Sequence, residues 1–328
     1  LFKDPHIIDI TFPYTKDFKK ELQIPKDALY KGKPRSRIAY LCASKRMDWE
    51  PVAWTDFDGK NIVFTDIQKG PVMRVATYER GRLRFWTDPF EINVSNEFHF
   101  FTPSDSVQDV TLFAKYTLRA DDMFLNRMIG GTFEGSNDPD FREKEVLYLI
   151  NEKPKRLQTV VQSYSSKPYR YVRYVGPKES HCNIAEVAFY TPNDTASLKG
   201  KVIGTPGCFQ KDGSHEYTNV FDGDVTTSFD YIEPSGGWSG IDLGIPKQIE
   251  KIVYTPRSYD NYIRSGDKYE LFYCTGKDKW ESLGKKVSEA DSLVYRDVPV
   301  NVLLLLKNYS KGVQERIFTY ERKGQVWK

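Results

Sequence analysis

A short acidic loop holds the densest group of potential metal ligands in the chain. Residues 220–229 read VFDGDVTTSF, so Asp222, Asp224 and Thr227 supply carboxylate and hydroxyl oxygens at close spacing. Gly223 lets the backbone turn back between them without a Cβ penalty. Hard cations such as Ca²⁺ take oxygen ligands of these kinds. Two interpretations remain open from the loop alone: a cation site, or an Asx-turn whose side chains hydrogen-bond only to local backbone.

Residue patterns of the common enzyme classes do not occur in the sequence. The four histidines, His6, His99, His181 and His215, are scattered and form no H-E-x-x-H or H-x-H pattern. His181 and Cys182 are adjacent, so a strand would point their side chains to opposite faces, which argues against a nucleophile–base pair between them. A pair of carboxylates from distant loops, as glycosidases use, remains an alternative. We therefore predict a protein without catalytic residues, with an unrecognised carboxylate enzyme as the alternative.

Composition excludes several other classes. The formal net charge of the 328 residues is +3, and acidic and basic residues alternate along the chain, which argues against a nucleic-acid partner. No run of 18 apolar residues occurs, so no membrane-spanning segment is expected. The four cysteines lie far apart without C-x-x-C spacing, and each is expected to be a small buried hydrophobic residue. Because the chain begins with Leu1, we expect a trimmed product that has lost a targeting segment.

The hydrophobic pattern has a period of two in most segments. Alternating or β-branched runs occur at 37–44, 61–67, 72–86, 169–175, 186–191, 268–274 and 302–309. Residues 105–120 also alternate and are expected to be a strand, and Arg80-Gly81 is expected to be a hairpin turn. Many short strands separated by turn residues predict an all-β fold of tandem β-sandwiches.

Two shifts in composition predict three domains. The first lies near 89–96, and the second is the polar, turn-rich segment 191–201 (TPNDTASLKGK). We therefore predict an N-terminal β-sandwich-like domain at 1–95, a second sandwich at 96–193 and a third at 194–328.

The third predicted domain resembles a discoidin, or factor V/VIII type C, domain of the galactose-binding-like superfamily. The motifs that carry the resemblance are VFDGDVTTSF (220–229), GGWSGIDLG (236–244), IEKIVYTPRSYDNYIRSGDKYELFYC (249–274), WESLG (280–284) and VQERIFTY (313–320). The resemblance implies a jelly-roll sandwich whose loops at one end bind sugars, lipid head groups or proteins.

The second predicted domain resembles a divergent relative of the same family. GGTFEGSNDPDF (130–141) with LYLI (147–150) is similar to one strand pair of the family, and YRYVRYVGPKESHCNIAEVAFY (169–190) is similar to its terminal hairpin. This domain has no D-G-D-x-x-T segment. Together with RMDWEPVAW (46–54), the motifs resemble the C-terminal half of secreted multidomain proteins of Bacteroides-type gut bacteria. Some of those proteins carry a transglutaminase- or peptidase-like domain upstream.

The resemblance implies that the acidic loop is part of a calcium site that joins two ends of one domain. It implies a structural Ca²⁺ held by the Asn219 carbonyl, by Asp222, Asp224 and Thr227, and by Glu315 near the C-terminus.

The resemblance also suggests where a ligand would bind. A sugar site combines a stacking aromatic ring with polar hydrogen-bonding groups, and the segment 256–267 (PRSYDNYIRSGD) offers both. The candidate ligand-binding residues are Tyr231, Trp238, Arg257, Tyr259, Asn261, Tyr262 and Arg264. In the alternative interpretation, Arg264 pairs with Asp267 and the tyrosines only cover the end of the sandwich.

These arguments predict a non-catalytic carbohydrate-binding or adhesion module that is secreted, periplasmic or on the outer cell surface. Its expected partner is a glycan or glycoprotein. The chief alternative is a structural scaffold for an upstream catalytic domain of the same protein.

Overall fold

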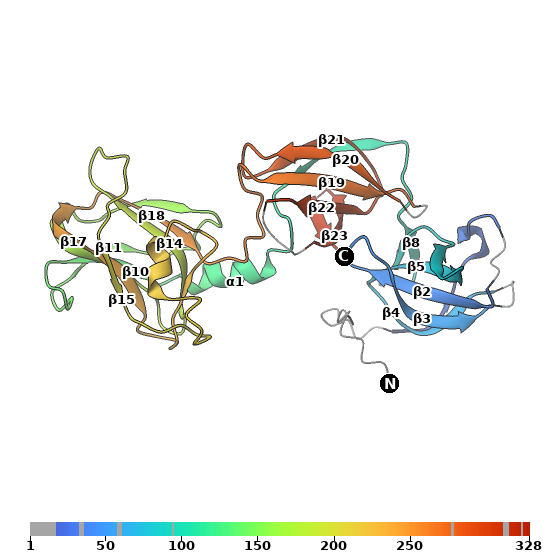
Figure 1. Cartoon of the computed structure of the whole chain (residues 1–328), viewed down its shortest axis with the longest axis horizontal. Coiled ribbons are helices and arrows are strands. Elements are labelled where there is room, and N and C mark those ends of the chain that lie inside the picture. The colour runs from blue at the N-terminus through green and yellow to red at the C-terminus, as the bar shows by residue number, and fades with distance from the viewer. Residues whose placement is uncertain are drawn as a thin grey trace. The chain divides into compact units, whose positions relative to one another are not determined.

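The computed structural model describes residues 18–32, 36–57, 61–93, 95–276, 279–310, 315–322 and 324–328. The described chain is nearly all strand, which confirms the predicted all-β fold of packed sheets. Its contacts divide it into two compact units (Figure 1). Unit 1 combines Leu1–Tyr116 with Tyr262–Lys328, and unit 2 is the intervening segment Thr117–Asn261.

Unit 2 is a sandwich of two antiparallel sheets. The first has the strand order β11-β10-β13-β17-β15, with β10 Thr132–Ser136, β11 Glu145–Leu149, β13 Pro168–Val175, β15 Lys201–Gly204 and β17 Trp238–Gln248. The second has the order β12-β18-β14-β16, with β12 Thr159–Gln162, β14 Cys182–Tyr190, β16 Phe229–Asp230 and β18 Lys251–Pro256. One α-helix, α1 (Arg119–Arg127), precedes β10, and a short 3₁₀ helix, η2 (Tyr217–Phe221), precedes β16.

One hydrophobic core lies between these two sheets. Phe133 of β10, Tyr174 of β13 and Phe189 of β14 are fully buried in it, together with Ile241 of β17 and Tyr254 of β18. The Phe133 ring lies 5.1 Å from the Tyr254 ring and 5.3 Å from the Tyr174 ring, centroid to centroid. The core therefore joins strands from both sides of the segment 191–201.

The first part of unit 1 is a six-stranded sheet packed against a two-stranded sheet. The larger sheet has the order β3-β2-β5-β7-β8, with β6 paired to β5: β2 Ile38–Ser44, β3 Glu50–Asp56, β5 Val72–Glu79, β6 Arg82–Phe85, β7 Phe90–Ile92 and β8 Phe98–Phe100. The smaller one pairs β1 (Phe18–Gln23) with β4 (Val63–Gln68), and a 3₁₀ turn, η1 (Lys26–Ala28), follows β1. Arg80 and Gly81 adopt φ angles of 52° and 77° between β5 and β6, which confirms the predicted hairpin turn.

The second part of unit 1 comes from two segments that are far apart in the sequence. A five-stranded sheet has the order β20-β19-β22-β23-β24: β19 Lys268–Cys274, β20 Trp280–Val287, β22 Leu304–Asn308, β23 Ile317–Glu321 and β24 Gly324–Trp327. Beside it, β9 (Val107–Leu112) pairs with β21 (Leu293–Pro299), and both strands contribute side chains to the same core. A separate apolar cluster joins Val72 of β5 to Leu303, Leu305 and Ile317, so both parts of unit 1 pack together.

The compact units differ from the three domains predicted from composition. β13 precedes the polar segment 191–201 and pairs along its length with β17, which follows it. β14 pairs with β16 and β18 in the same way. The predicted boundary at 193/194 is therefore wrong, because it separates strands that share both sheets of unit 2. The boundary at 95/96 is also not a division between units, since both 1–95 and β9 belong to unit 1.

The alternating segment 105–120 is a strand only in part. β9 occupies 107–112, but α1 begins at Arg119. Asp121 and Asp122 in the first helical turn and Arg127 in the last complement the helix dipole, a local signal that the alternation obscures. All four cysteines are buried and free, which confirms their interpretation as small hydrophobic residues.

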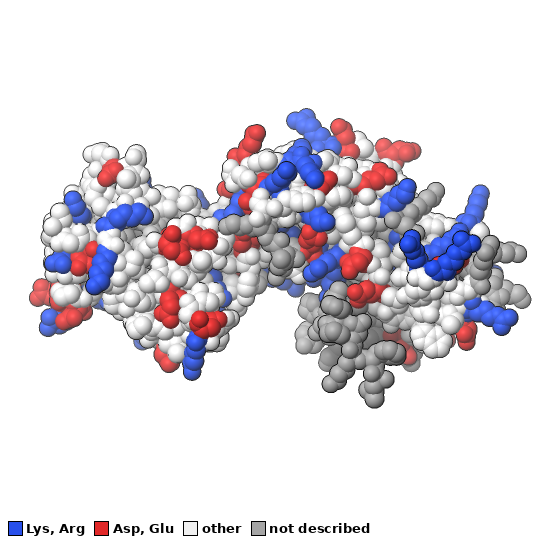
Figure 2. Space-filling model, in the orientation of Figure 1, with Lys and Arg blue, Asp and Glu red and all other residues white. Residues whose placement is uncertain are grey.

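The charged side chains are distributed in the structure as they are in the sequence, without a large basic cluster on the face drawn (Figure 2). On the face drawn in Figure 2, acidic and basic side chains are interspersed over both units. None of the helices in the described part of the chain is long and apolar enough to cross a membrane.

Candidate functional site

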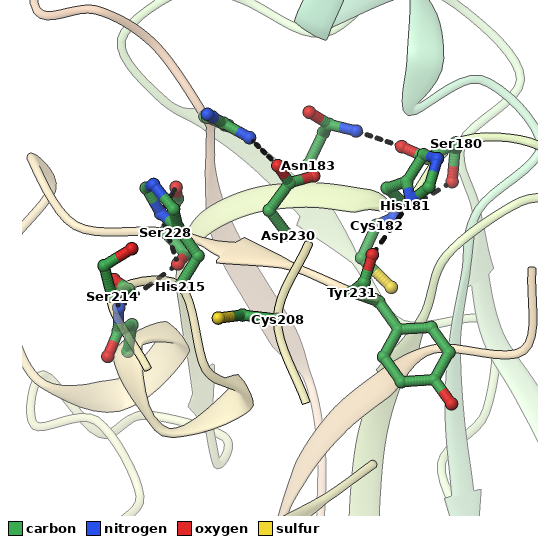
Figure 3. Close-up of polar contacts among 12 residues, drawn as sticks. Ser180, His181, Cys182, Asn183, Cys208, Ser214, His215, Ser228, Asp230 and Tyr231 are labelled. Atoms are coloured by element: carbon green, nitrogen blue, oxygen red, sulfur yellow. Dashed lines mark hydrogen bonds and ion pairs between the residues drawn. The ribbon is translucent and has the colours of Figure 1, made fainter. Parts of the chain in front are cut away.

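A polar cluster lies in unit 2 where β14 begins beside β16 (Figure 3). Asp230 of β16 accepts an ion-pair hydrogen bond from the Arg257 guanidinium, and these side chains are 10% and 12% exposed. The guanidinium also lies over the Phe124 ring of α1, 4.7 Å from its centroid. A charged pair this well covered is held in one geometry by its surroundings, so it presents fixed polar atoms at this end of the sandwich.

The backbone at the start of β14 is strained. His181, Cys182 and Asn183 follow one another with φ angles of 57°, 73° and 50°, a left-handed conformation that costs about 1 kcal/mol or more per non-glycine residue. Ser180 holds this turn, because its hydroxyl accepts a hydrogen bond from the Cys182 N–H (3.1 Å) and donates one to the Pro177 carbonyl (2.7 Å). Backbone strain of this kind concentrates at binding and catalytic sites.

Asn183 carries an unsatisfied acceptor in this turn. Its amide nitrogen donates to the Ser180 carbonyl, but its Oδ1 is buried and has no partner among the residues that the structure describes. A buried acceptor without a partner costs about 1–3 kcal/mol, and this cost adds to the backbone strain of the turn.

His181 connects the polar cluster to an exposed aromatic ring. Its Nδ1 lies 2.8 Å from the Tyr231 carbonyl, which only accepts, so Nδ1 carries the proton and Nε2 of the neutral ring is an acceptor. The imidazole meets the Phe209 ring edge-on at 5.0 Å between centroids, and Phe209 is 56% exposed. The Phe209 N–H donates to the Asp230 carbonyl (2.8 Å), which holds the Phe209 backbone beside that of Asp230.

His215 supports this arrangement from the other side of β16. Its Nδ1 lies 3.3 Å from the Ser228 carbonyl, and its own carbonyl accepts from the Asp230 N–H (3.1 Å). The Asn219 amide donates to the carbonyls of Ser214 and Ser228. These bonds tie the loop before β16 to the strand, so His215 and Asn219 position the site.

The acidic loop forms local hydrogen bonds. Asp222 Oδ1 accepts from the Asp224 N–H (2.7 Å), and Asp222 Oδ2 accepts from the Thr227 hydroxyl (2.8 Å). Asp224 Oδ1 accepts from the Thr226 N–H and hydroxyl at 2.9 and 2.6 Å. These are the bonds of the Asx-turn interpretation, and they gather the loop's oxygens on one side.

A carboxylate from a distant strand meets this loop. Glu186 of β14 accepts a hydrogen bond from the Gly223 N–H (2.8 Å). Burial, followed by a hydrogen bond with Asp222, raises the pKa of Glu186 to about 8. Two carboxyl groups in contact need a shared proton or a bound cation between them.

Glu315 does not belong to this constellation. It lies in unit 1, directly before β23, whereas Asn219, Asp222, Asp224 and Thr227 lie in unit 2. Its predicted role in closing one domain is therefore wrong, because 315 and 222 do not share a domain. Within the described ranges, no three or more His, Cys, Asp or Glu side chains are grouped to hold a metal ion.

The predicted ligand residues of unit 2 are only partly brought together. Tyr231 and Arg257 belong to the polar cluster. Trp238 packs instead against Phe141 (5.8 Å between ring centroids) and under the Arg173 guanidinium (5.0 Å), so its ring is occupied by protein contacts. Tyr259 is 53% exposed.

The segment 256–267 is not one ligand-binding loop. Asn261 is buried and donates to the Thr117 carbonyl (3.1 Å), at the end of unit 2. Tyr262 begins the return into unit 1, where it is 3% exposed and bridges to Ala114. The Arg264 guanidinium lies over the Tyr262 ring at 5.7 Å. The two residues are thus part of unit 1 packing, and the chain passes between units in the middle of the predicted loop.

Sequence reasoning missed Glu186, Asn183 and Phe209. The Ala185-Glu186 pair before the last strand of the terminal hairpin was the available signal for Glu186. The composition places Glu186 and the acidic loop in different predicted domains, so their contact could not be predicted. The sequence offers His181 only as an isolated histidine beside Cys182, and Phe209 has no local signal.

No known family, curated protein or solved structure matches the chain.

Proposed function

We propose that unit 2 is a non-catalytic carbohydrate-binding module. The observation that carries the proposal is the exposed Phe209 ring fixed beside His181 and the Asp230–Arg257 pair, next to a strained backbone turn. An aromatic face suits the apolar C–H face of a pyranose, and the neighbouring acceptors and donors suit its hydroxyls.

Hydrogen-bond acceptors in the cluster indicate which ligand group this site would take. With the proton on Nδ1, His181 Nε2 is an acceptor, and the Asp230 carboxylate of the same cluster also accepts. Both suit a donor, and a sugar offers adjacent hydroxyl donors. The resemblance of the predicted third domain (194–328) to discoidin-type domains implies the same ligand class, and its motifs at 220–229 and 236–244 lie in unit 2. We further propose a location outside the cytoplasm or on the cell surface, where glycans are displayed.

Replacing Phe209 by Ala is expected to weaken glycan binding by the full chain about tenfold or more, since the stacking surface is lost (~1.4 kcal/mol). The measurement is a glycan array with the intact protein, followed by calorimetric titration of the strongest sugar. Phe113→Ala is the matched control, because Phe113 is also a well-exposed Phe (61%) but lies in unit 1. Binding that survives Phe209→Ala unchanged would place the sugar elsewhere.

If the correctly folded chain binds no sugar on the glycan array, the scaffold alternative is favoured. In that role, the two units would support or dock a catalytic domain of the same protein.

We also propose that the acidic loop binds a structural Ca²⁺, with Glu186 in the place that the sequence assigned to Glu315. The residues fit this ion: carboxylates of Asp222 and Glu186 meet beside the Thr227 hydroxyl, and oxygen groups of these kinds are what Ca²⁺ takes. The ion would join η2 and β14 across the sandwich. Its role would be to stabilise the fold.

In EDTA, the melting temperature is expected to fall as the pH rises from about 5 to 8. The folded protein keeps a proton on Glu186, whose pKa is about 8, while the unfolded chain releases it near the ordinary value of 4.5, so ionisation favours unfolding across this range. Saturating Ca²⁺ at pH 8 is expected to raise the melting temperature and remove this slope. Glu186→Gln should abolish both effects in thermal unfolding followed by circular dichroism. An unchanged melting temperature with Ca²⁺ at pH 8 would contradict the cation site.

A further inference from the structure

An open pocket lies at the end of unit 2 that is opposite the polar cluster. Its volume is about 490 Å³, and it is lined by residues 136–138 and 143–145 with Lys167 and Tyr169. In the pairing of β13 with β17, Pro168 faces Gln248 at the pocket end, and Val175 faces Trp238 at the other end. The Tyr174 hydroxyl donates to the Cys182 carbonyl, which places the His181 turn at that other end.

The pocket lining is fixed by hydrogen bonds. Glu145 Oε2 accepts from the Tyr169 hydroxyl (2.6 Å) and from Lys167 Nζ (2.8 Å). These contacts hold the pKa of the Glu145 carboxyl at about 2. The Ser136 hydroxyl donates to the Glu143 carbonyl (2.5 Å), which closes the turn between β10 and β11. The polar groups are therefore placed before any ligand arrives, which lowers the entropic cost of binding.

Gly135 allows the Tyr169 ring, which lines this pocket, to pack against the β10 backbone. A Cβ on Gly135 would lie 2.6 Å from the Tyr169 ring, closer than side chains approach one another. The Tyr169 ring therefore lies directly on the β10 backbone. Glycine here permits a close approach of an aromatic ring that forms part of the pocket wall.

An exposed aromatic edge continues from the pocket along β11. Tyr164 is 62% exposed, its ring lies 5.3 Å from that of Tyr148, and its N–H donates to the Leu147 carbonyl (2.7 Å). Glu145 pairs with Gly135 and Tyr148 with Phe133, whose side chain faces the interior, so Glu145 and Tyr148 project to the same side of β11. At about 3.3 Å per residue, the pocket and the tyrosines are roughly 10 Å apart, the length of one or two sugar rings.

The charges of the lining select against an acidic ligand. Three carboxylates, Asp138, Glu143 and Glu145, line the pocket with only two lysines. Lys144 already pairs with Glu134 (2.6 Å), and Lys167 with Glu145. Asp138 in turn pairs with Arg142 (3.0 Å). Because each lysine of the lining is already paired with a carboxylate, an anionic ligand would meet no uncompensated lysine there.

From this geometry we infer that the pocket is a second sugar site, which takes a neutral oligosaccharide with one ring in the pocket and the next on Tyr164. The inference rests on the proposed function of unit 2 and adds a separate site to it. Hydroxyl donors would bond to the carboxylates, and a neutral pyranose would cover the exposed tyrosine edge.

The test titrates the full chain with lactose, maltotriose and xylotriose by calorimetry, with glucuronic acid and glucosamine as charged comparisons. Tyr164→Ala and Glu143→Ala are expected to weaken one of two binding events about tenfold or more, through loss of a ring face and of an exposed acceptor. The matched controls are Glu289→Ala and Tyr78→Ala, which change an exposed Glu and an exposed Tyr of unit 1. Both controls are expected to bind as the unmodified chain does.

Each result decides between the two sites. Loss of one binding event in the pocket variants and of the other in Phe209→Ala supports both. Full binding in the pocket variants with loss in Phe209→Ala overturns the pocket alone. Preferential binding of glucuronic acid or glucosamine overturns the neutral-sugar assignment, and absence of any sugar binding overturns the proposed function together with the pocket.

Discussion

Residues 117–261, produced as a separate polypeptide, are expected to fold into one cooperative unit, whereas residues 194–328 are expected to stay unfolded. The fragment 194–328 matches a domain boundary that composition favours, but it lacks β10, β13 and β14. Without these strands, β17 keeps only β15 as a partner, and β18 has none of its sandwich partners.

The size of the effect follows from the missing core. The fragment 194–328 loses the buried side chains Phe133, Tyr174, Ile184, Val187 and Phe189. At about 1.5–3 kcal/mol for each buried side chain, this loss is comparable to the whole stability of an ordinary domain, about 5–15 kcal/mol.

Circular dichroism and amide-resolved NMR on both fragments make the comparison. Cooperative unfolding of 117–261 with dispersed amide signals would support the division into units 1 and 2. A folded 194–328 fragment with the same signals would contradict it.

Arg74→Met is expected to destabilise unit 1 by about 1–3 kcal/mol, because the Thr87 carbonyl loses its side-chain donor, whereas the Gly276 carbonyl keeps the Tyr30 hydroxyl as a donor (2.9 Å). Arg74 is 1% exposed, its Nε donates to the Thr87 carbonyl (3.0 Å), and its Nη2 donates to the Gly276 carbonyl. Its guanidinium also lies 4.3 Å from the Phe85 ring centroid and 5.4 Å from that of Trp49. Methionine has no charge and cannot make these cation–π contacts.

Chemical denaturation of the full chain is the measurement, with tryptophan fluorescence reporting unit 1 and unit 2 separately where their transitions differ. Arg82→Met is the matched control, since Arg82 is exposed on the neighbouring hairpin strand and should change stability by less than about 0.5 kcal/mol. Equal effects of the two substitutions would show that the buried guanidinium contributes no more than a surface one.

The sequence alone determined most of the strands. Alternating burial in β6 and in the second half of β14 follows the period-2 pattern of their residues, because a sheet with one covered face imposes that period locally. The strands β2 and β5 are buried along most of their length, as their continuous apolar and β-branched residues allow. The hairpin at Arg80-Gly81 and the buried cysteines were foreseen for the same reason: each depends on neighbours in sequence or on residue type. The acidic loop was also recognisable, since its hydrogen bonds stay within six residues.

Only the tertiary structure decided which strands pair. A period-2 pattern states which face of a strand is covered, but it carries no information on which strand covers it. For that reason the predicted second sandwich (96–193) and the predicted third (194–328) are not separate domains: strands from 130–190 and from 200–261 form one sandwich, and the rest of the predicted third domain belongs to unit 1. The same non-local pairing brought Glu186 to Asp222 and left Glu315 in the other unit. The candidate sites depend on these pairings, because each one joins residues that are distant in sequence and adjacent only across the sheets.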